Sequence, residues 1–229
     1  MYDPRNESPF NALPPAVVAL AFVIAAVEVL FQFGAAGLAG AEGGAWRGAA
    51  VRDWSVFPPV LEWMVANRSV PWDFAARFVT YPFIHFGLIH AGFVAVFVLA
   101  LGNAVAPVFP GWRPVAFFVL PAVAGGLVYA AAFPGAGPLI GGYPGAYGLI
   151  GAFTLLTRRG LTRVPPDRAF LLIGLLLAIQ PIFGLAAGAG FAWFPDFVAE
   201  VVGAAAGYGL AAAMFPGAAR RFRDRMRRR

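Results

Sequence analysis

The sequence predicts an all-α membrane protein built as a bundle of six transmembrane helices. The chain has 229 residues, of which 60% are hydrophobic and 12% are charged, and its mean hydropathy is +0.74. Because no soluble domain of this size needs so much apolar surface, the bilayer is the expected solvent. Six apolar stretches are long enough to cross about 30 Å of hydrocarbon at about 1.5 Å per residue. They comprise residues 14–38, 82–105, 114–133, 139–157, 168–187 and 195–215.

The arginines predict how this bundle is oriented. All 17 basic residues are arginine, and 13 of them fall on one side of the membrane if both termini are cytoplasmic. The other four lie in the loop of residues 39–80, which the positive-inside rule therefore places outside. We expect one membrane domain, residues 14–215, between cytoplasmic tails of residues 1–13 and 216–229. The high content of Arg, Ala and Gly favours a bacterial cytoplasmic (inner) membrane.

The first extracytoplasmic loop, residues 39–80, is long and amphipathic. It contains four tryptophans, and Pro58 and Pro59 predict the start of a short helix within it. Tryptophan-rich, half-apolar segments outside a span usually lie in the headgroup layer. We therefore expect this loop to contact membrane lipid.

Composition and spacing exclude several classes of function. The chain has no cysteine, which excludes disulfides, thiolate metal sites and cysteine nucleophiles. Its net charge of +6 comes from arginines in short loops and in the C-terminal tail, so we expect no nucleic acid partner. The two histidines, His85 and His90, would lie about 140° apart around a helix, and no third ligand follows at helical spacing. We expect no metal and no cofactor. The histidines either bond loop carbonyls at the membrane interface or have a functional role.

Two carboxyl groups within the apolar stretches require an explanation, because an ionisable group at bilayer depth costs about 2.5–3.5 kcal/mol. Glu28 is expected to bond a neighbouring helix or to lie near one end of its span. Glu200 precedes Gly203 and Gly207, a GxxxG step that lets two helices approach closely. A similar series of small residues occupies the fourth stretch, at Gly145, Gly148 and Gly151. We therefore expect the fourth and sixth helices to pack on each other.

The order and spacing of these residues resemble those of the rhomboid intramembrane serine proteases. That family has six spans, a long amphipathic first loop and a His-x4-His-x3-Asn-x7-Gly pattern on its second helix. In this chain His85 and His90 have that spacing, and Gly102 occupies the place of the glycine. Val94 stands where the family has asparagine.

The two motifs that carry the catalytic pair of that family are altered in this chain. The Gly-x-Ser-Gly motif of the family opens its fourth helix, where this chain has Tyr143 in the serine position and Pro144 in the next. A register shifted by one residue places Pro144 in the serine position instead. The sixth helix of the family carries His-x2-Gly-x3-Gly, and Glu200 takes the place of its histidine. Tyr147 falls where an aromatic residue of the family packs against the catalytic imidazole.

The resemblance implies a rhomboid fold, in which a short fourth helix begins mid-membrane below a water-filled cavity open to the outside. The residues themselves argue against peptidase chemistry, which needs an activated hydroxyl and donors for the oxyanion. The serines of the chain, Ser8, Ser55 and Ser69, all lie outside the spans. Val94 lacks the donor of an asparagine, and Pro144 has no N–H. The spacing gives no support to a carboxyl dyad of Glu28 and Glu200.

We therefore expect a rhomboid-like pseudoprotease that binds transmembrane helices of client membrane proteins without cleaving them. The residues expected to line its client cavity are His85, His90, Tyr143, Pro144, Tyr147 and Glu200. Two alternatives stay open at this point: a rhomboid-family peptidase that acts through an unrecognised dyad, and a pathway for a small solute or a lipid. The sequence also leaves the oligomeric state open.

Overall fold

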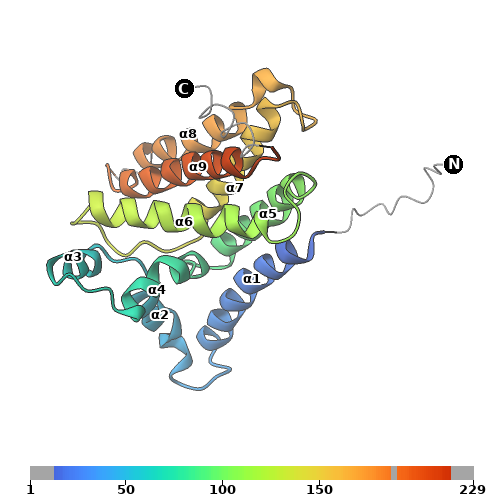
Figure 1. Cartoon of the computed structure of the whole chain (residues 1–229). Helices are drawn as coiled ribbons and strands as arrows, with labels where there is room; N and C mark the ends of the chain where they lie inside the picture. The colour runs from blue at the N-terminus through green and yellow to red at the C-terminus, as the bar shows by residue number, and fades with distance from the viewer. Residues whose placement is uncertain (1–12, 187–189, 218–229) are drawn as a thin grey trace.

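A computed structural model describes residues 13–186 and 190–217 of the chain (Figure 1). Within these ranges the secondary structure is helical, apart from one isolated antiparallel bridge between Val56 and Leu139. The predicted all-α class is therefore confirmed.

Each of the six predicted stretches contains one long helix. These helices are α1 (Pro15–Ala35), α5 (Leu88–Val105), α6 (Arg113–Ala132), α7 (Tyr143–Arg158), α8 (Leu171–Ala186) and α9 (Phe194–Met214). Four of them, α1, α5, α6 and α9, are long and apolar enough to cross a membrane, which indicates a multi-pass membrane protein. Helices α7 and α8 have 16 residues each and are about 24 Å long, shorter than the hydrocarbon core. The count of six spans stays a prediction.

Proline starts most of the helices. It occupies the first turn of α1, α6, α7 and α9, and of the loop helix α3 (Pro58–Ala66). The missing N–H of proline is harmless there, because the first N–H groups of a helix have no intrahelical acceptor. The prolines therefore fix where these helices begin.

The long loop between α1 and α5 is largely helical. Besides α3, which begins at Pro58 as predicted, it contains α2 (Trp46–Trp54), α4 (Trp72–Thr80) and a short 3-10 turn (Tyr81–Phe83). Trp54, Trp63 and Trp72 expose much of their surface. Contact of these indoles with lipid stays a prediction.

The second predicted span begins later than expected, which corrects the helical geometry assumed for the two histidines. Residues 82–87 are not part of α5, because Pro82 lies in the 3-10 turn and Gly87 is extended, with φ of 166°. His85 thus precedes the helix that carries His90. The angle of 140° between them does not apply.

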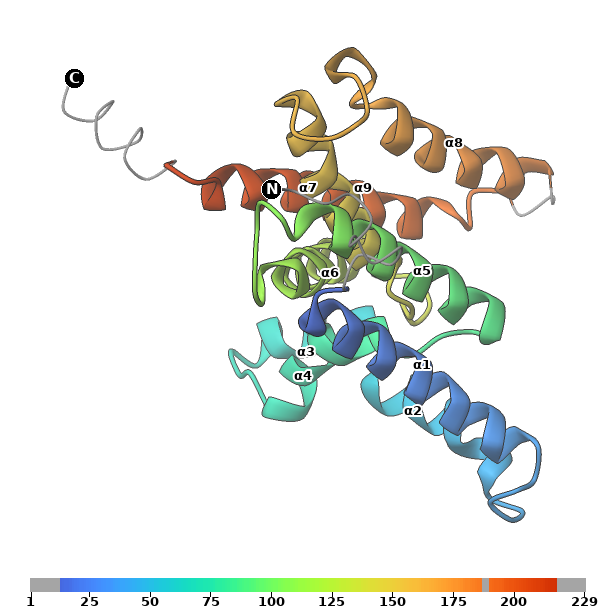
Figure 2. The same cartoon turned by 90° about the vertical axis from the view of Figure 1, so that its right-hand side faces the viewer.

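Helix α7 lies at the centre of the bundle. Nearly all of its side chains are buried, and it packs against α9, α6 and α5. Helices α1 and α8 lie at opposite edges of the bundle in both views (Figures 1 and 2). The residues at the start of α7 are therefore surrounded by protein on most sides.

Glycines bring α7 and α9 into backbone contact. A Cβ added at Gly203 would overlap the carbonyl oxygen of Pro144, and one at Gly207 would overlap that of Gly148. On α7, a Cβ at Gly151 would overlap the carbonyl oxygen of Ala204. Close approach of this kind is the usual role of small residues between membrane helices.

Gly145 faces a different helix, and so does the Cβ direction of Gly148, although the backbone of Gly148 contacts Gly207; this corrects part of the predicted packing. A Cβ at Gly145 would lie 2.7 Å from the carbonyl oxygen of Phe118, and one at Gly148 would lie 2.5 Å from Pro121, both on α6. The reason is the helical period, because a step of three residues turns the side-chain direction by about 60°. Three glycines spaced in this way cover a wide arc and serve both neighbours of α7.

Candidate functional site

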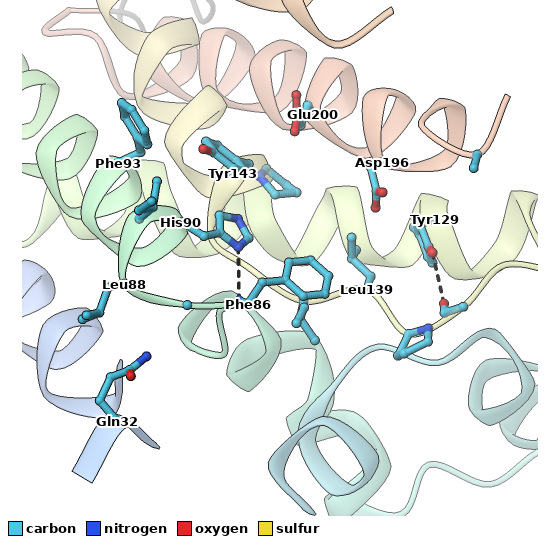
Figure 3. Close-up of a pocket in the computed structure, with 17 residues that line it drawn as sticks. Gln32, Phe86, Leu88, His90, Phe93, Tyr129, Leu139, Tyr143, Asp196 and Glu200 are labelled. Carbon is cyan, nitrogen blue, oxygen red and sulfur yellow. Dashed lines mark hydrogen bonds between the residues drawn. The ribbon is translucent and has the colours of Figure 1, made fainter. Parts of the chain in front are cut away.

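A cavity of about 1070 Å³ lies where five helices of the bundle begin or end. Its lining includes Gln32 near the end of α1 and Tyr129 near the end of α6, together with the first turns of α5, α7 and α9. Because α1 and α6 run toward this end and the other three run away from it, it is the end that the arginine pattern places outside. Figure 3 shows the residues around this space.

Tyr143 and His90 form the centre of an aromatic stack in this cavity. The two rings are stacked, with centroids 4.9 Å apart, and Phe86 also stacks on His90, at 5.5 Å. The backbone N–H of Phe86 also donates a hydrogen bond to Nδ1 of His90 (Figure 3). The residue in the predicted serine position is therefore a packed aromatic ring.

The turn that precedes α7 is held against both histidines. Gly141 has φ of +97°, a conformation that other residues rarely adopt, and a Cβ there would lie 2.5 Å from Cε1 of His90. The N–H of Gly142 donates to Nε2 of His85 at 3.4 Å. The turn therefore fixes the entry of α7 beside His90.

His85 is a buried structural acceptor behind the cavity. It is fully buried and is not among the lining residues, and its ring contacts that of His90 edge to face at 5.0 Å. Burial lowers the pKa of its imidazole to about 4, so the ring is neutral at pH 7 and can accept the Gly142 N–H. This places His85 close to the predicted site but outside its lining.

Val94 is also buried behind the cavity. A Cβ at Gly142 would lie 2.7 Å from Cγ1 of Val94, so this side chain presents a methyl group to the turn before α7. An asparagine there could donate a hydrogen bond, which valine cannot. The position contributes packing rather than an oxyanion donor.

Glu200 points into the bundle and lines the cavity. Only 2% of its surface is exposed, and its carboxyl lies within electrostatic reach of Tyr147 of α7. A buried carboxyl needs such a partner, because an unsatisfied polar group in an apolar surrounding is costly. Of the three partners expected from the sequence, Tyr143 and Tyr147 lie near enough to interact with Glu200, although Tyr147, predicted as a lining residue, is not among those that line the cavity.

Asp196 is a second carboxyl in the cavity, and sequence reasoning missed it. It lies on α9, four residues before Glu200, and both side chains line the same space (Figure 3). Residues four apart share one face of a helix, so the position of Glu200 could have led to Asp196. Tyr129 and Gln32 also line the cavity without having been predicted to do so.

Glu28 belongs to a separate ion pair. Its carboxylate accepts two hydrogen bonds from Arg47 of α2, at 2.8 and 2.9 Å, and one from Gln32 at 2.7 Å. Arg47 also donates to the carbonyl of His85 and lies over the ring of Phe31. Glu28 thus ties the first loop to α1, and these contacts give no support to a dyad with Glu200.

The cavity offers hydrogen-bonding groups but no ordinary nucleophile. Its polar side chains are carboxyls, phenols, one imidazole and one amide, and neither Ser55 nor Ser69 lines it. In the part of the chain that the structure describes, no three His, Asp or Glu residues come together as a metal site would require. The polar side chains of the lining can donate and accept hydrogen bonds.

A family model described as the Rhomboid domain matches residues 73–217 of the chain. No curated protein matches the chain. The matched segment includes α5 to α9 and every residue that lines the cavity except Gln32.

Proposed function

Since the chain belongs to the rhomboid family, we propose that it is a pseudoprotease whose cavity binds a transmembrane segment of a client membrane protein without cleaving it. The observation that supports this proposal is the pair Tyr143 and Glu200. Both line one cavity, at the positions that the resemblance assigns to the catalytic serine and histidine.

Neither residue can carry out acyl transfer in this arrangement. A phenol has a pKa near 10, and the ring of Tyr143 is stacked on His90 instead of being paired with a base. Glu200 interacts electrostatically with Tyr147 and has no serine, threonine or cysteine beside it in the cavity lining. The N–H of Gly142 is used by His85, and Pro144 has none, so neither position offers a backbone donor to an oxyanion.

Binding of a client helix requires polar groups at a depth where lipid offers none. A transmembrane helix that is frayed or unwound exposes backbone N–H and C=O groups, and these have no partner in hydrocarbon. The carboxyls and phenols of this cavity would provide partners, and its apolar lining residues would contact the rest of the helix. We place the protein in a bacterial cytoplasmic membrane with both termini in the cytoplasm.

Site-specific crosslinking tests the proposal. A photoreactive amino acid at position 143, introduced into the full chain in its native membrane, should crosslink to transmembrane segments, which mass spectrometry then identifies. The matched control is position 29. Val29 lies on α1 near the end that borders the cavity and is 60% exposed, but it does not line the cavity. Crosslinks from position 143 to lipid alone would favour a lipid pathway and contradict client binding.

A further inference from the structure

We propose that this cavity selects client transmembrane segments that carry a lysine or arginine near their outer end, and that Asp196 and Glu200 recognise the basic group. The inference rests on the proposed function and adds the chemistry of the client. It goes beyond the family resemblance, because Asp196 belongs to none of the motifs that carry that resemblance.

The first argument is the position of the two carboxyls. Asp196 and Glu200 lie one turn apart on α9, which separates them by about 6 Å along the helix axis. Asp196 is exposed at the mouth of the cavity, whereas Glu200 is buried deeper in the bundle. A long basic side chain that entered the cavity would meet the two groups in succession.

The second argument is the sign of the charge around the cavity. Its described lining contains these two acidic side chains and no arginine, and the chain has no lysine. The arginine of the neighbouring loop helix, Arg47, is paired with Glu28. The lining therefore favours a cation and disfavours an anion.

The third argument is the apolar face that continues from the cavity along α5. Ile89, Phe93 and Val96 are exposed by 78%, 57% and 60%, and the first two line the cavity. Their spacing of four and three residues places them on one stripe of the helix. A client helix that packs along this stripe would bring its outer end to the carboxyls of α9.

A basic residue also gains more from this site than a neutral one. Lysine and arginine within a span are costly in lipid, and they are stabilised when they meet an acidic partner in a polar cavity. A neutral amide has no such charge to compensate, and a client glutamate would meet like charges. The preference should therefore follow the order Lys, Gln, Glu.

The test uses three transmembrane peptides that differ at one position near the outer end, which is Lys, Gln or Glu. The full chain is reconstituted in nanodiscs of phosphatidylcholine, because the headgroup of this lipid has no N–H that could donate a hydrogen bond to the carboxyls. Peptide affinity is measured by fluorescence titration. We expect the Lys peptide to bind at least about tenfold more tightly than the Gln peptide, and the Glu peptide to bind most weakly.

Variants separate the role of the carboxyls from general charge effects. Asp196→Lys should reverse the preference, so that the Glu peptide binds more tightly than the Lys peptide; because Asp196 is exposed, the variant is expected to fold. Glu200→Gln should reduce the preference for Lys. The matched control is Asp73→Lys, the same change of charge at an exposed position of α4 outside the cavity, and it should leave the order unchanged.

The outcomes distinguish this inference from the function on which it rests. If all three peptides bind equally, or if Asp196→Lys leaves the order unchanged, the inference is overturned, and client binding itself stands. If none of the peptides binds and position 143 crosslinks to none of them, the proposed function fails and the inference fails with it.

Discussion

The backbone contact between α7 and α9 leads to a sharp prediction for a single methyl group. In Gly207→Ala the added Cβ would overlap the carbonyl oxygen of Gly148 and approach its Cα. Both are backbone atoms within a buried helix, so no flexible side chain can move to make room. The two helix axes must separate. The contacts of Gly203 and Gly151 along the same seam, the interface between α7 and α9, would then be weakened together.

The expected cost can be estimated from the contacts that are lost. The hydrogen that a side chain would replace at Gly207 points toward a carbonyl oxygen, and such contacts are worth about 0.5–1 kcal/mol each at helix interfaces. Three glycines of this seam, at positions 151, 203 and 207, make contacts of this kind. Their partial loss agrees with the 1–3 kcal/mol that is typical of overpacking. We expect Gly207→Ala to lower the free energy of unfolding by about 2 kcal/mol.

The matched control lies two residues further along the same helix. A Cβ at Gly209 meets nothing within 4 Å, so Gly209→Ala adds a methyl group in open space and should be neutral or slightly stabilising. The chain has six tryptophans, and their fluorescence can follow unfolding in mixed micelles of increasing SDS content. The reasoning is refuted if Gly207→Ala unfolds at the same SDS fraction as Gly209→Ala.

Three further predictions concern the site and its support. A fluorophosphonate probe should not label the protein. The variant Tyr143→Ser should leave a model transmembrane substrate intact in a gel-based cleavage assay. Cleavage by this variant would show that Glu200 can act as the base. Arg47→Ala leaves a buried carboxyl without its cation and should cost about 3 kcal/mol in the SDS titration, whereas Arg52→Ala, at an exposed ion pair, should cost less than about 1 kcal/mol. Gly141→Ala combines an unfavourable φ with a clash against the ring of His90 and should lower both stability and peptide affinity. The control is Gly135→Ala, whose Cβ meets nothing within 4 Å. Equal stability and equal peptide affinity for the two variants would contradict the role of the turn.

The elements of this fold could be predicted from sequence because apolar length and proline position determine them locally. Each predicted stretch contains one helix, and Pro58 marks the start of a loop helix. The packing of Gly203 and Gly207 against α7 also follows from a local pattern, since a GxxxG step makes one face of a helix small. These features need no knowledge of which segments meet in space.

The site could be predicted only in part, because its geometry depends on turns and on contacts between distant segments. His85 and His90 lie in ring contact because the chain turns at residues 82–87, and helical periodicity gives no indication of this turn. Arg47 reaches Glu28 from a loop helix 19 residues later in the chain. Asp196 lies at the start of α9, where an acidic residue also suits the helix dipole, so its sequence position alone does not single it out.

The contacts at positions 143 and 200 explain how the fold accommodates a tyrosine and a glutamate there. The seam of α7 and α9 is formed by glycines and backbone atoms, so its stability does not depend on a serine or a histidine above it. Tyr143 stacks on His90, a type of contact worth about 0.5–1.5 kcal/mol, and Glu200 interacts electrostatically with Tyr147. Both positions have thus acquired structural partners of their own. A serine at position 143 alone would remove the aromatic stack and would still leave Glu200 beside Tyr147. On the proposed function, peptidase chemistry would therefore need coordinated changes on α5, α7 and α9, whereas client binding would need only that the cavity keep its shape and its charge.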